Sequence, residues 1–234
     1  MQVQLARVDR ARKEFIANAS HELRTPIFSL AGFVELLEDE QLDRETRDEF
    51  LRLMREQVDR LQKLAVDLLD LSRLDAGSLE INAEEVDIGE LATTVAAEFR
   101  PAVAQHRTEL ELRLPDGAVA ARCDRERVAQ IMRILLDNAL RHTPEGTPVT
   151  VMASRSNGAA ELSVADKGPG LAPATRGHAF ERFFTADAAR GSGLGLAIAK
   201  ELTEQMHGRI TLHSRPGRTI FKIALPAPDE DGSA

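Results

Sequence analysis

Residues 15–27 read Phe15-Ile-Ala-Asn-Ala-Ser-His21-Glu22-Leu-Arg-Thr25-Pro-Ile27, and this stretch decides the fold of the first third of the chain. Apolar residues recur at intervals of seven, which predicts a helix with an apolar stripe suited to a bundle. They are Ile16, Leu23, Leu30 and Leu37, with Ile27 and Val34 between them. At about 100° per residue, His21 points roughly 160° away from Leu23. We therefore expect His21 to face solvent, with Thr25 one turn further on the same face.

The same periodicity predicts two long helices joined by a short polar connection. Residues 1–39 form the first helix, and Pro26 should bend it because proline lacks an N–H. Asp43 is expected to cap a second helix that runs to about residue 74, and Gly77 to end it. The apolar face of this hairpin is too wide for two helices to bury, so we predict a homodimeric four-helix bundle.

Composition narrows the classes of function. Hydrophobic residues make up 43% of the 234 residues and aromatic residues only 4%, which predicts an aliphatic core. The net charge of -8 and the scarcity of stacking side chains argue against nucleic acid as a partner. Cys123 is the single cysteine, which excludes an internal disulfide and a multi-cysteine zinc site.

No apolar run approaches the ~18 residues that a membrane helix needs, and no signal peptide is visible. We expect a soluble chain suited to a cytoplasmic location, with no direct membrane contact of its own. Nothing in it resembles a sensor. We therefore expect either a piece of a longer protein, such as the cytoplasmic portion of a membrane sensor, or sensing by a partner.

The second half alternates helix and strand patterns, which predicts an α/β sandwich. Helices are expected over about 87–105, 124–142 and 194–206, each of the first two after an aspartate cap. Strands are expected over 108–114, 118–123, 149–154, 159–165, 209–214 and 219–225. The predicted domains are a helical hairpin at 1–77, a linker at 78–86, an α/β domain at 87–226 and a disordered tail at 227–234.

Four segments of the second half contain candidate nucleotide-binding residues. On the predicted helix before residue 142, Asn138, Arg141 and His142 share one turn, which suits magnesium and phosphates. Asp166 ends a strand that runs into a glycine loop, where a carboxylate can accept a hydrogen bond from the amine of adenine. Glycines there let the backbone approach a ligand closely. The residues of this loop are Gly168, Gly170 and Leu171.

A second glycine-rich segment opens the helix predicted from residue 194. Glycines before a helix N-terminus expose N–H groups to an anion. Its residues are Gly191, Ser192, Gly193, Leu194, Gly195 and Leu196. It matches neither a Walker A loop nor a Rossmann fingerprint. The fourth segment, residues 180–184, contains three phenylalanines and is interpreted as the anchor of a lid over residues 185–190. Taken singly, each segment also fits a helix end, a turn or a hydrophobic anchor.

In order and spacing these segments resemble the asparagine, first glycine, phenylalanine and second glycine boxes of the sensor histidine kinases of two-component systems. The segment around His21 resembles the phosphoacceptor box of the same family, and the resemblance covers about residues 10–226. The catalytic domain of that family has the Bergerat ATPase fold, shared with type II topoisomerases and a chaperone family.

The resemblance implies an ATP- and Mg²⁺-dependent protein-histidine kinase that acts as a homodimer. His21 would be the nucleophile, Glu22 the group that accepts its proton, and Thr25 the residue that orients water for a phosphatase activity. Asn138 would bind Mg²⁺ and Asp166 adenine, with Thr219 beside the nucleotide. The phosphoryl group would pass to the receiver domain of a response regulator.

Three positions depart from the family pattern. Ile134 replaces an asparagine, Thr185 replaces a basic residue after the phenylalanines, and the turn at residues 216–219 is one residue short. These departures bear on catalytic efficiency more than on function. Two alternatives stay open: a dimeric pseudokinase or phosphatase scaffold that binds nucleotide without autophosphorylation, and a free-standing ATPase.

Overall fold

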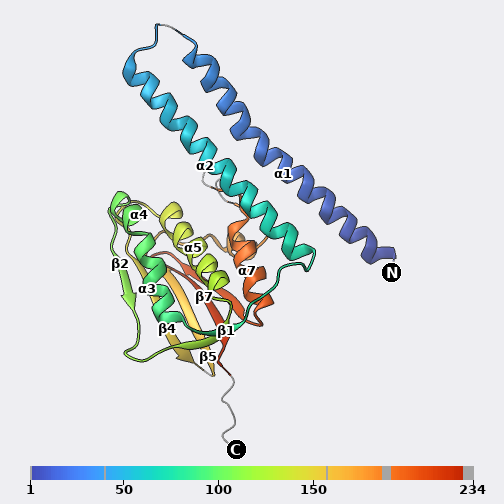
Figure 1. Cartoon of the computed structure of the whole chain (residues 1–234), viewed down its shortest axis with the longest axis vertical. Helices are drawn as coiled ribbons and strands as arrows, with labels where there is room; N and C mark the ends of the chain where they lie inside the picture. Colours follow the sequence, from blue (N-terminus) through green and yellow to red (C-terminus); the bar gives the residue numbers. More distant parts are fainter. Residues whose placement is uncertain (1, 40, 157, 186–190, 229–234) are drawn as a thin grey trace, which may run out of the picture. The chain divides into compact units, whose positions relative to one another are not determined.

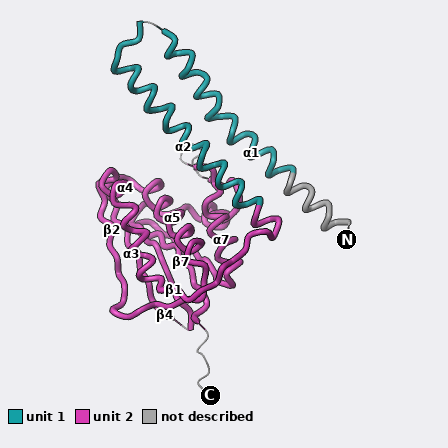
Figure 2. The backbone as a smooth tube through the Cα atoms, in the orientation of Figure 1, with its two compact units in different colours: residues 1–72 teal, residues 73–234 magenta. Residues whose placement is uncertain are grey.

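The computed structural model describes residues 2–39, 41–156, 158–185 and 191–228, and the chain divides into two compact units, residues 1–72 and 73–234 (Figure 2). The predicted lid residues 186–190, Asn157 between two predicted strands, and the predicted tail from residue 229 lie outside these ranges. In the described ranges, no helix combines the length and apolar character that a membrane span requires.

The first unit is a hairpin of two long helices, α1 (Gln2–Leu37) and α2 (Arg44–Asp75), which confirms the prediction (Figure 1). Asp43 caps α2 as expected, because its Oδ1 accepts a hydrogen bond from the Thr46 amide at 2.9 Å. The helices also meet through the rings of Phe33 and Phe50, whose centroids lie 5.7 Å apart.

Gly77 ends α2 with a left-handed backbone at φ 60°. Its amide donates to the Leu74 carbonyl, and the Ser78 amide to that of Arg73. These bonds pair carbonyl groups that the last turn of α2 would otherwise leave without an amide donor.

The second unit is a mixed sheet covered by helices (Figure 1). Five strands pair in the order β2-β4-β5-β7-β6; β2 and β4 are parallel and the other neighbours antiparallel. The strands are β2 (Leu110–Arg113), β4 (Val149–Ser156), β5 (Ala159–Asp166), β6 (Arg209–Arg215) and β7 (Arg218–Pro226). The covering helices are α3 (Ile88–Glu98), α5 (Arg125–His142) and α7 (Gly195–Gln205). The predicted α/β sandwich is therefore confirmed.

A second, two-stranded sheet pairs β1 (Glu84–Asp87) with β3 (Ala120–Cys123). Most of β1 falls in the predicted linker, residues 78–86. Its partner strand lies more than thirty residues further along the chain, so no local hairpin signal marks the pair.

The helix predicted over residues 87–105 is two helices, α3 and α4 (Arg100–Gln105). Pro101 explains the break at Phe99, because proline cannot donate to the carbonyl four residues earlier. A further short helix, α6 (Pro173–Arg176), was not predicted.

The core of the second unit lies between α5, α7 and the five-stranded sheet. Its largest fully buried side chains are aliphatic, as the composition indicates. They include Ile131, Met132, Leu135, Leu136, Leu162, Ile198, Leu202, Ile223 and Leu225. This core packs α5 against α7 and β5, and α7 against β6. The candidate site lies beside it, at the end of β5 and the start of β7.

Candidate phosphoacceptor and nucleotide sites

The candidate acceptor site lies on α1, where His21 is exposed as predicted. Glu22 is half-buried, and its Oε2 accepts a hydrogen bond from Arg60 Nη2 on α2 at 3.3 Å. Arg60 was not singled out from the sequence, because it lies 38 residues away and no local motif marks it. The ion pair limits the positions open to the carboxylate beside His21.

Thr25 and Pro26 shape the backbone around His21. The exposed Thr25 hydroxyl donates to the His21 carbonyl at 3.4 Å, so it lies on the predicted face. Pro26 is buried inside the continuous helix α1 and has no N–H to donate to the Glu22 carbonyl four residues earlier.

Asp166, the last residue of β5, is only 7% exposed. Burial raises the pKa of this carboxyl above its usual range, and the hydrogen bond from the Gly168 amide at 2.8 Å opposes that shift. Thr219 of β7 pairs with Asp166 across the sheet and is also buried. A buried carboxylate of this kind favours a ligand group that can donate a hydrogen bond to it.

The first glycine loop packs tightly on its neighbours. A Cβ at Gly168 would lie 2.6 Å from Thr143 Cγ2, and one at Gly170, where φ is +77°, 2.5 Å from the Arg215 carbonyl oxygen. Thr143 follows α5 directly, so this contact brings the end of α5 to the Asp166 loop. Larger residues at these two glycines would push the loop away from α5 and β6.

Ser214 and Thr143 are two site residues that sequence reasoning missed. Ser214 Oγ accepts a hydrogen bond from the Leu171 amide at 2.8 Å and lies 3.1 Å from Thr219 Oγ1. Thr143 donates to the Ala139 carbonyl at 2.7 Å. Both side chains act through tertiary contacts, so their positions in the sequence carry no recognisable motif.

On α5 the three predicted residues lie near its C-terminal end. Asn138 is half-buried, while Arg141 and His142 are exposed. Arg141 Nε donates to Asp137 Oδ1 at 2.8 Å, so this guanidinium already has a carboxylate partner on its own helix. The half-buried amide of Asn138 supplies the hard oxygen that Mg²⁺ accepts, with water and phosphate oxygens as its usual further ligands.

The second glycine segment precedes α7, as predicted. Gly193 has φ +70°, and α7 begins at Gly195, where a Cβ would lie 3.2 Å from Ile134 Cγ2 of α5. In the part of the chain that the structure describes, no side chain caps this helix start. Its N–H groups therefore suit an anion such as a phosphate.

The phenylalanine segment packs on the sheet. The Phe180 ring meets that of Phe221 on β7 edge to face, with centroids 6.2 Å apart. This contact supports the predicted hydrophobic anchor at residues 180–184. The remainder of the predicted lid, residues 186–190, is outside the described residues.

The structure thus places the second unit's predicted residues in two groups that meet on α5. Asp166, Thr219 and the first glycine loop adjoin the end of α5 through Thr143. The second glycine segment reaches α5 through Ile134, one turn before Asn138. Such an arrangement can hold a base at the buried carboxylate and phosphates at the start of α7.

Two family models match the chain. Residues 11–77 match the His Kinase A (phospho-acceptor) domain, and residues 123–229 match the histidine kinase-, DNA gyrase B- and HSP90-like ATPase. The first match contains His21 and the second contains Asn138, Asp166 and the glycine segments.

Among curated proteins, the sensor-like histidine kinase SenX3 of Mycobacterium tuberculosis is 34% identical over 230 residues. The match covers 95% of this chain and 55% of SenX3, so the chain spans about half the length of this relative.

Two solved structures are also similar. A structure of full-length ShkA in complex with AMPPNP has a TM-score of 0.69 and 33% identity, covering 92% of this chain and 46% of ShkA. The mycobacterial sensor histidine kinase MprB has a TM-score of 0.55 and 30% identity, covering 62% of this chain and 97% of the MprB chain.

Proposed function

Because this chain belongs to the sensor histidine kinase family, we propose that it is an ATP-dependent protein-histidine kinase that phosphorylates His21. The observation that carries the proposal is the pairing of two features in one chain. An exposed histidine with an adjacent carboxylate lies in a phosphoacceptor segment, and a buried carboxylate with two glycine turns lies in an ATPase segment.

In the proposed reaction, an imidazole nitrogen of His21 attacks the γ-phosphorus of ATP. The bond to the β,γ-bridging oxygen breaks, ADP leaves, and the ring proton passes to Glu22. Arg60 restricts the Glu22 carboxylate through the 3.3 Å ion pair, so the base is held beside the nucleophile. Little else is required of the protein than to position the reactants and to stabilise charge.

The second unit would hold the nucleotide. Asp166 accepts a hydrogen bond from the amine of adenine, with Thr219 beside it, and the first glycine loop lets the base approach. Residues 191–196 present N–H groups of the α7 start to the phosphates. Arg141 and His142 lie on the same turn of α5 as Asn138 and add positive charge when protonated. Asn138 would hold Mg²⁺, which neutralises charge on the phosphates when it is bound.

The hairpin surface supports a proposal of dimerisation. Large apolar side chains stay exposed on both helices, including Ile27 (53%), Val34 (48%), Leu51 (50%) and Val58 (50%). A soluble chain seldom leaves so many apolar groups in water, and a second hairpin would cover them. We therefore propose a homodimer with a four-helix bundle, made of a phosphotransfer hairpin at 1–77 and an ATP-binding domain at 87–226, joined by the segment 78–86.

The next step proposed is transfer of the phosphoryl group from His21 to an aspartate of a response-regulator receiver domain. The exposed face around His21 would receive that domain. The Thr25 hydroxyl on the same face would orient water for removal of the phosphoryl group from the regulator. The match of residues 11–77 to a phospho-acceptor domain supports the transfer step.

The test is incubation with γ-labelled ATP and Mg²⁺, using the wild-type chain, His21→Gln and His213→Gln. His213 is exposed on β6 and has no role here, so it is the matched histidine control. We expect an acid-labile, alkali-stable label in the wild type and in His213→Gln, and none in His21→Gln. Label that persists in His21→Gln would contradict the choice of acceptor. Nucleotide binding without label would favour the pseudokinase or phosphatase scaffold.

A further inference from the structure

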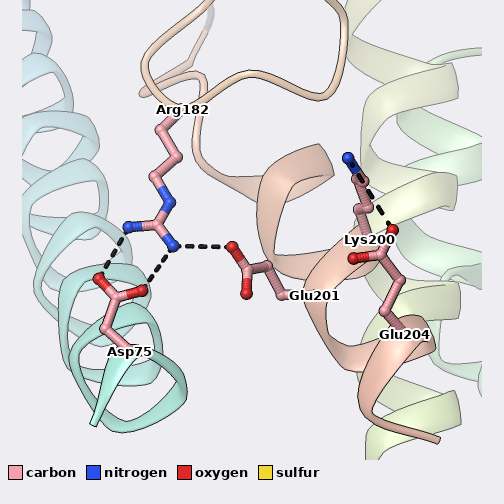
Figure 3. A network of polar contacts seen from close by, with 5 residues as sticks. All are labelled: Asp75, Arg182, Lys200, Glu201 and Glu204. Atoms are coloured by element: carbon pink, nitrogen blue, oxygen red, sulfur yellow. Dashed lines mark hydrogen bonds and ion pairs between the residues drawn. The ribbon is translucent and has the colours of Figure 1, made fainter. Parts of the chain in front are cut away.

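Arg182, in the phenylalanine segment, is the centre of a three-residue ion-pair network (Figure 3). Its Nη1 donates to Asp75 Oδ2 at 2.7 Å and its Nη2 to Asp75 Oδ1 at 2.6 Å. The same Nη2 donates to Glu201 Oε1 of α7 at 2.7 Å. All three residues belong to the second unit, since that unit begins at Arg73, within the last turn of α2.

The geometry of this network differs from that of an ordinary surface ion pair. The Arg182 side chain is only 32% exposed and binds Asp75 through two parallel bonds. Bidentate pairing of this kind fixes the orientation of the guanidinium plane. The bonds to Asp75, and then those to Glu201, raise the pKa of Arg182 above its ordinary value, although burial opposes the shift.

The backbone that follows Arg182 is strained. Phe183 adopts φ +61°, a left-handed conformation that a bulky side chain rarely takes. Such a conformation costs on the order of 1–3 kcal/mol and persists only where the surroundings hold it. Arg182 is the adjacent residue, and its three bonds hold this part of the chain to two other elements.

The backbone of Phe183 and Phe184 lies directly against Gly193 of the second glycine segment. A Cβ at Gly193 would lie 2.6 Å from the Phe183 carbonyl carbon and 2.8 Å from the Phe184 amide nitrogen. Gly193 therefore rests directly on this backbone, two residues before α7 begins. Further along α7, the Glu201 carboxylate accepts a hydrogen bond from the Arg182 side chain. The segment thus contacts α7 at two points, by its backbone near the helix start and by its side chain along the helix.

We propose that Arg182 is a positioning residue for the second glycine segment. Together with Asp75 and Glu201, it holds residues 182–184 in the conformation that supports Gly193 and the start of α7. This inference rests on the proposed ATP site at that turn. Because Asp75 is the last residue of α2, the network also ties the end of that helix to the turn. Loss of either carboxylate partner should loosen the turn without touching the nucleotide.

The experiment measures the affinity for AMPPNP and the KM for ATP in Arg182→Gln, Arg182→Lys, Asp75→Asn and Glu201→Gln. We expect Arg182→Gln to weaken AMPPNP binding and to raise KM about tenfold, a change of about 1.4 kcal/mol. Asp75→Asn and Glu201→Gln should each weaken binding about threefold. Arg182→Lys should fall between the wild type and Arg182→Gln, because lysine keeps the charge and loses the fork.

The matched control is Arg133→Gln. Arg133 of α5 also forms a bidentate pair, donating from Nε and Nη2 to Glu98 at 2.7 and 2.9 Å, and Glu98 lies at the end of α3, not in the second glycine segment. Arg133→Gln should leave AMPPNP affinity within about twofold of the wild type while lowering the melting temperature by a similar amount to Asp75→Asn.

Two results separate this inference from the proposed function. If the wild type binds AMPPNP and all four variants bind it equally well, whatever their melting temperatures, the network is structural only and the inference is overturned. If Arg182→Gln does not fold, AMPPNP binding by Asp75→Asn decides instead, because asparagine has nearly the same side-chain volume as aspartate. Wild-type affinity in Asp75→Asn would overturn the inference. If the wild type binds no nucleotide, the proposed function fails and the inference fails with it.

Discussion

The two units of the chain differ in how far they bury their apolar side chains. The hairpin leaves Phe28 68% exposed, Leu69 60% and Ile16 54%, whereas the α/β unit keeps Ile131, Leu162 and Ile223 at 0%. The α/β unit therefore closes its core within one chain. The hairpin presents an apolar surface that needs a second surface to cover it, so its structure as a single chain is one half of the proposed bundle.

The units also differ in how their chemistry is assembled. In the hairpin the proposed acceptor His21 and the Glu22 carboxylate are neighbours in sequence, and Arg60 adds a tertiary constraint. In the α/β unit, residues from α5, β5, β7 and the start of α7 come together only after folding. The proposed acceptor site can be identified from the sequence of a single helix, whereas the proposed nucleotide site depends on the folded core. A Leu→Ala substitution should therefore have different consequences in the two units.

The largest expected effect contrasts one substitution in the two units. Leu162→Ala removes a fully buried side chain from β5 and should cost about 2–5 kcal/mol of unfolding free energy. Leu69→Ala removes a side chain that is 60% exposed in the single chain, so it should instead weaken the dimer. Urea unfolding measures the first change and sedimentation equilibrium the second. A Leu69→Ala chain that dimerises like the wild type would remove Leu69 from the proposed interface.

A second prediction concerns Asn138, the proposed Mg²⁺ ligand. Asn138→Ala should lower the initial rate of His21 phosphorylation by on the order of a hundredfold, because the charge developing on the phosphates loses its neutralising partner. The measurement is the rate of label uptake at saturating Mg²⁺. Asn82→Ala, at an exposed position, is the control and should phosphorylate at the wild-type rate. Equal rates in the two variants would remove the role assigned to Asn138.

A smaller effect follows from the raised pKa of Asp166. Its folded form binds a proton more tightly than the unfolded chain does, so its contribution to stability is fully present at low pH. That contribution is lost as pH rises from the ordinary aspartate range through the raised native pKa. Asp166→Asn cannot ionise, so its stability relative to the wild type should increase with pH across that window and then level off. Urea unfolding at a series of pH values tests this, and a stability of Asp166→Asn that falls relative to the wild type as pH rises would contradict it.

The smallest effect concerns Cys123, buried on β3. Burial, followed by the neighbouring Asp124 and Glu84 carboxylates, raises the pKa of its thiol to about 12. Thiolate is the reactive form, so alkylation should be slow in the native chain at neutral pH and rapid after denaturation. The alkylation rate then reports opening of the α/β unit alone, since the chain has one cysteine. Fast alkylation under native conditions would show that the β1–β3 sheet opens readily.

Local signals account for what the sequence predicts well. The caps at Asp43 and Asp124 and the glycine at position 77 act within a few residues, and the structure has all three. The exposure of His21 follows from helical periodicity alone. Where one residue and its near neighbours decide the conformation, sequence reasoning needs no tertiary information.

Tertiary contacts account for the rest. The parallel pairing of β2 with β4, the β1–β3 pair and the strand order join segments that no short motif relates. Thr143 and Ser214 became visible only through their contacts with Gly168 and Leu171. Such residues need the fold before their contribution can be identified.

The most direct test of the account is to locate the phosphoryl group after incubation of the chain with ATP and Mg²⁺. Peptides are separated under alkaline conditions, in which phosphohistidine survives, and sequenced by mass spectrometry. We expect the added phosphoryl mass on the peptide that contains His21, on the imidazole itself. The same mass on a peptide that contains His106, His142, His178, His207 or His213, with none on His21, would contradict it.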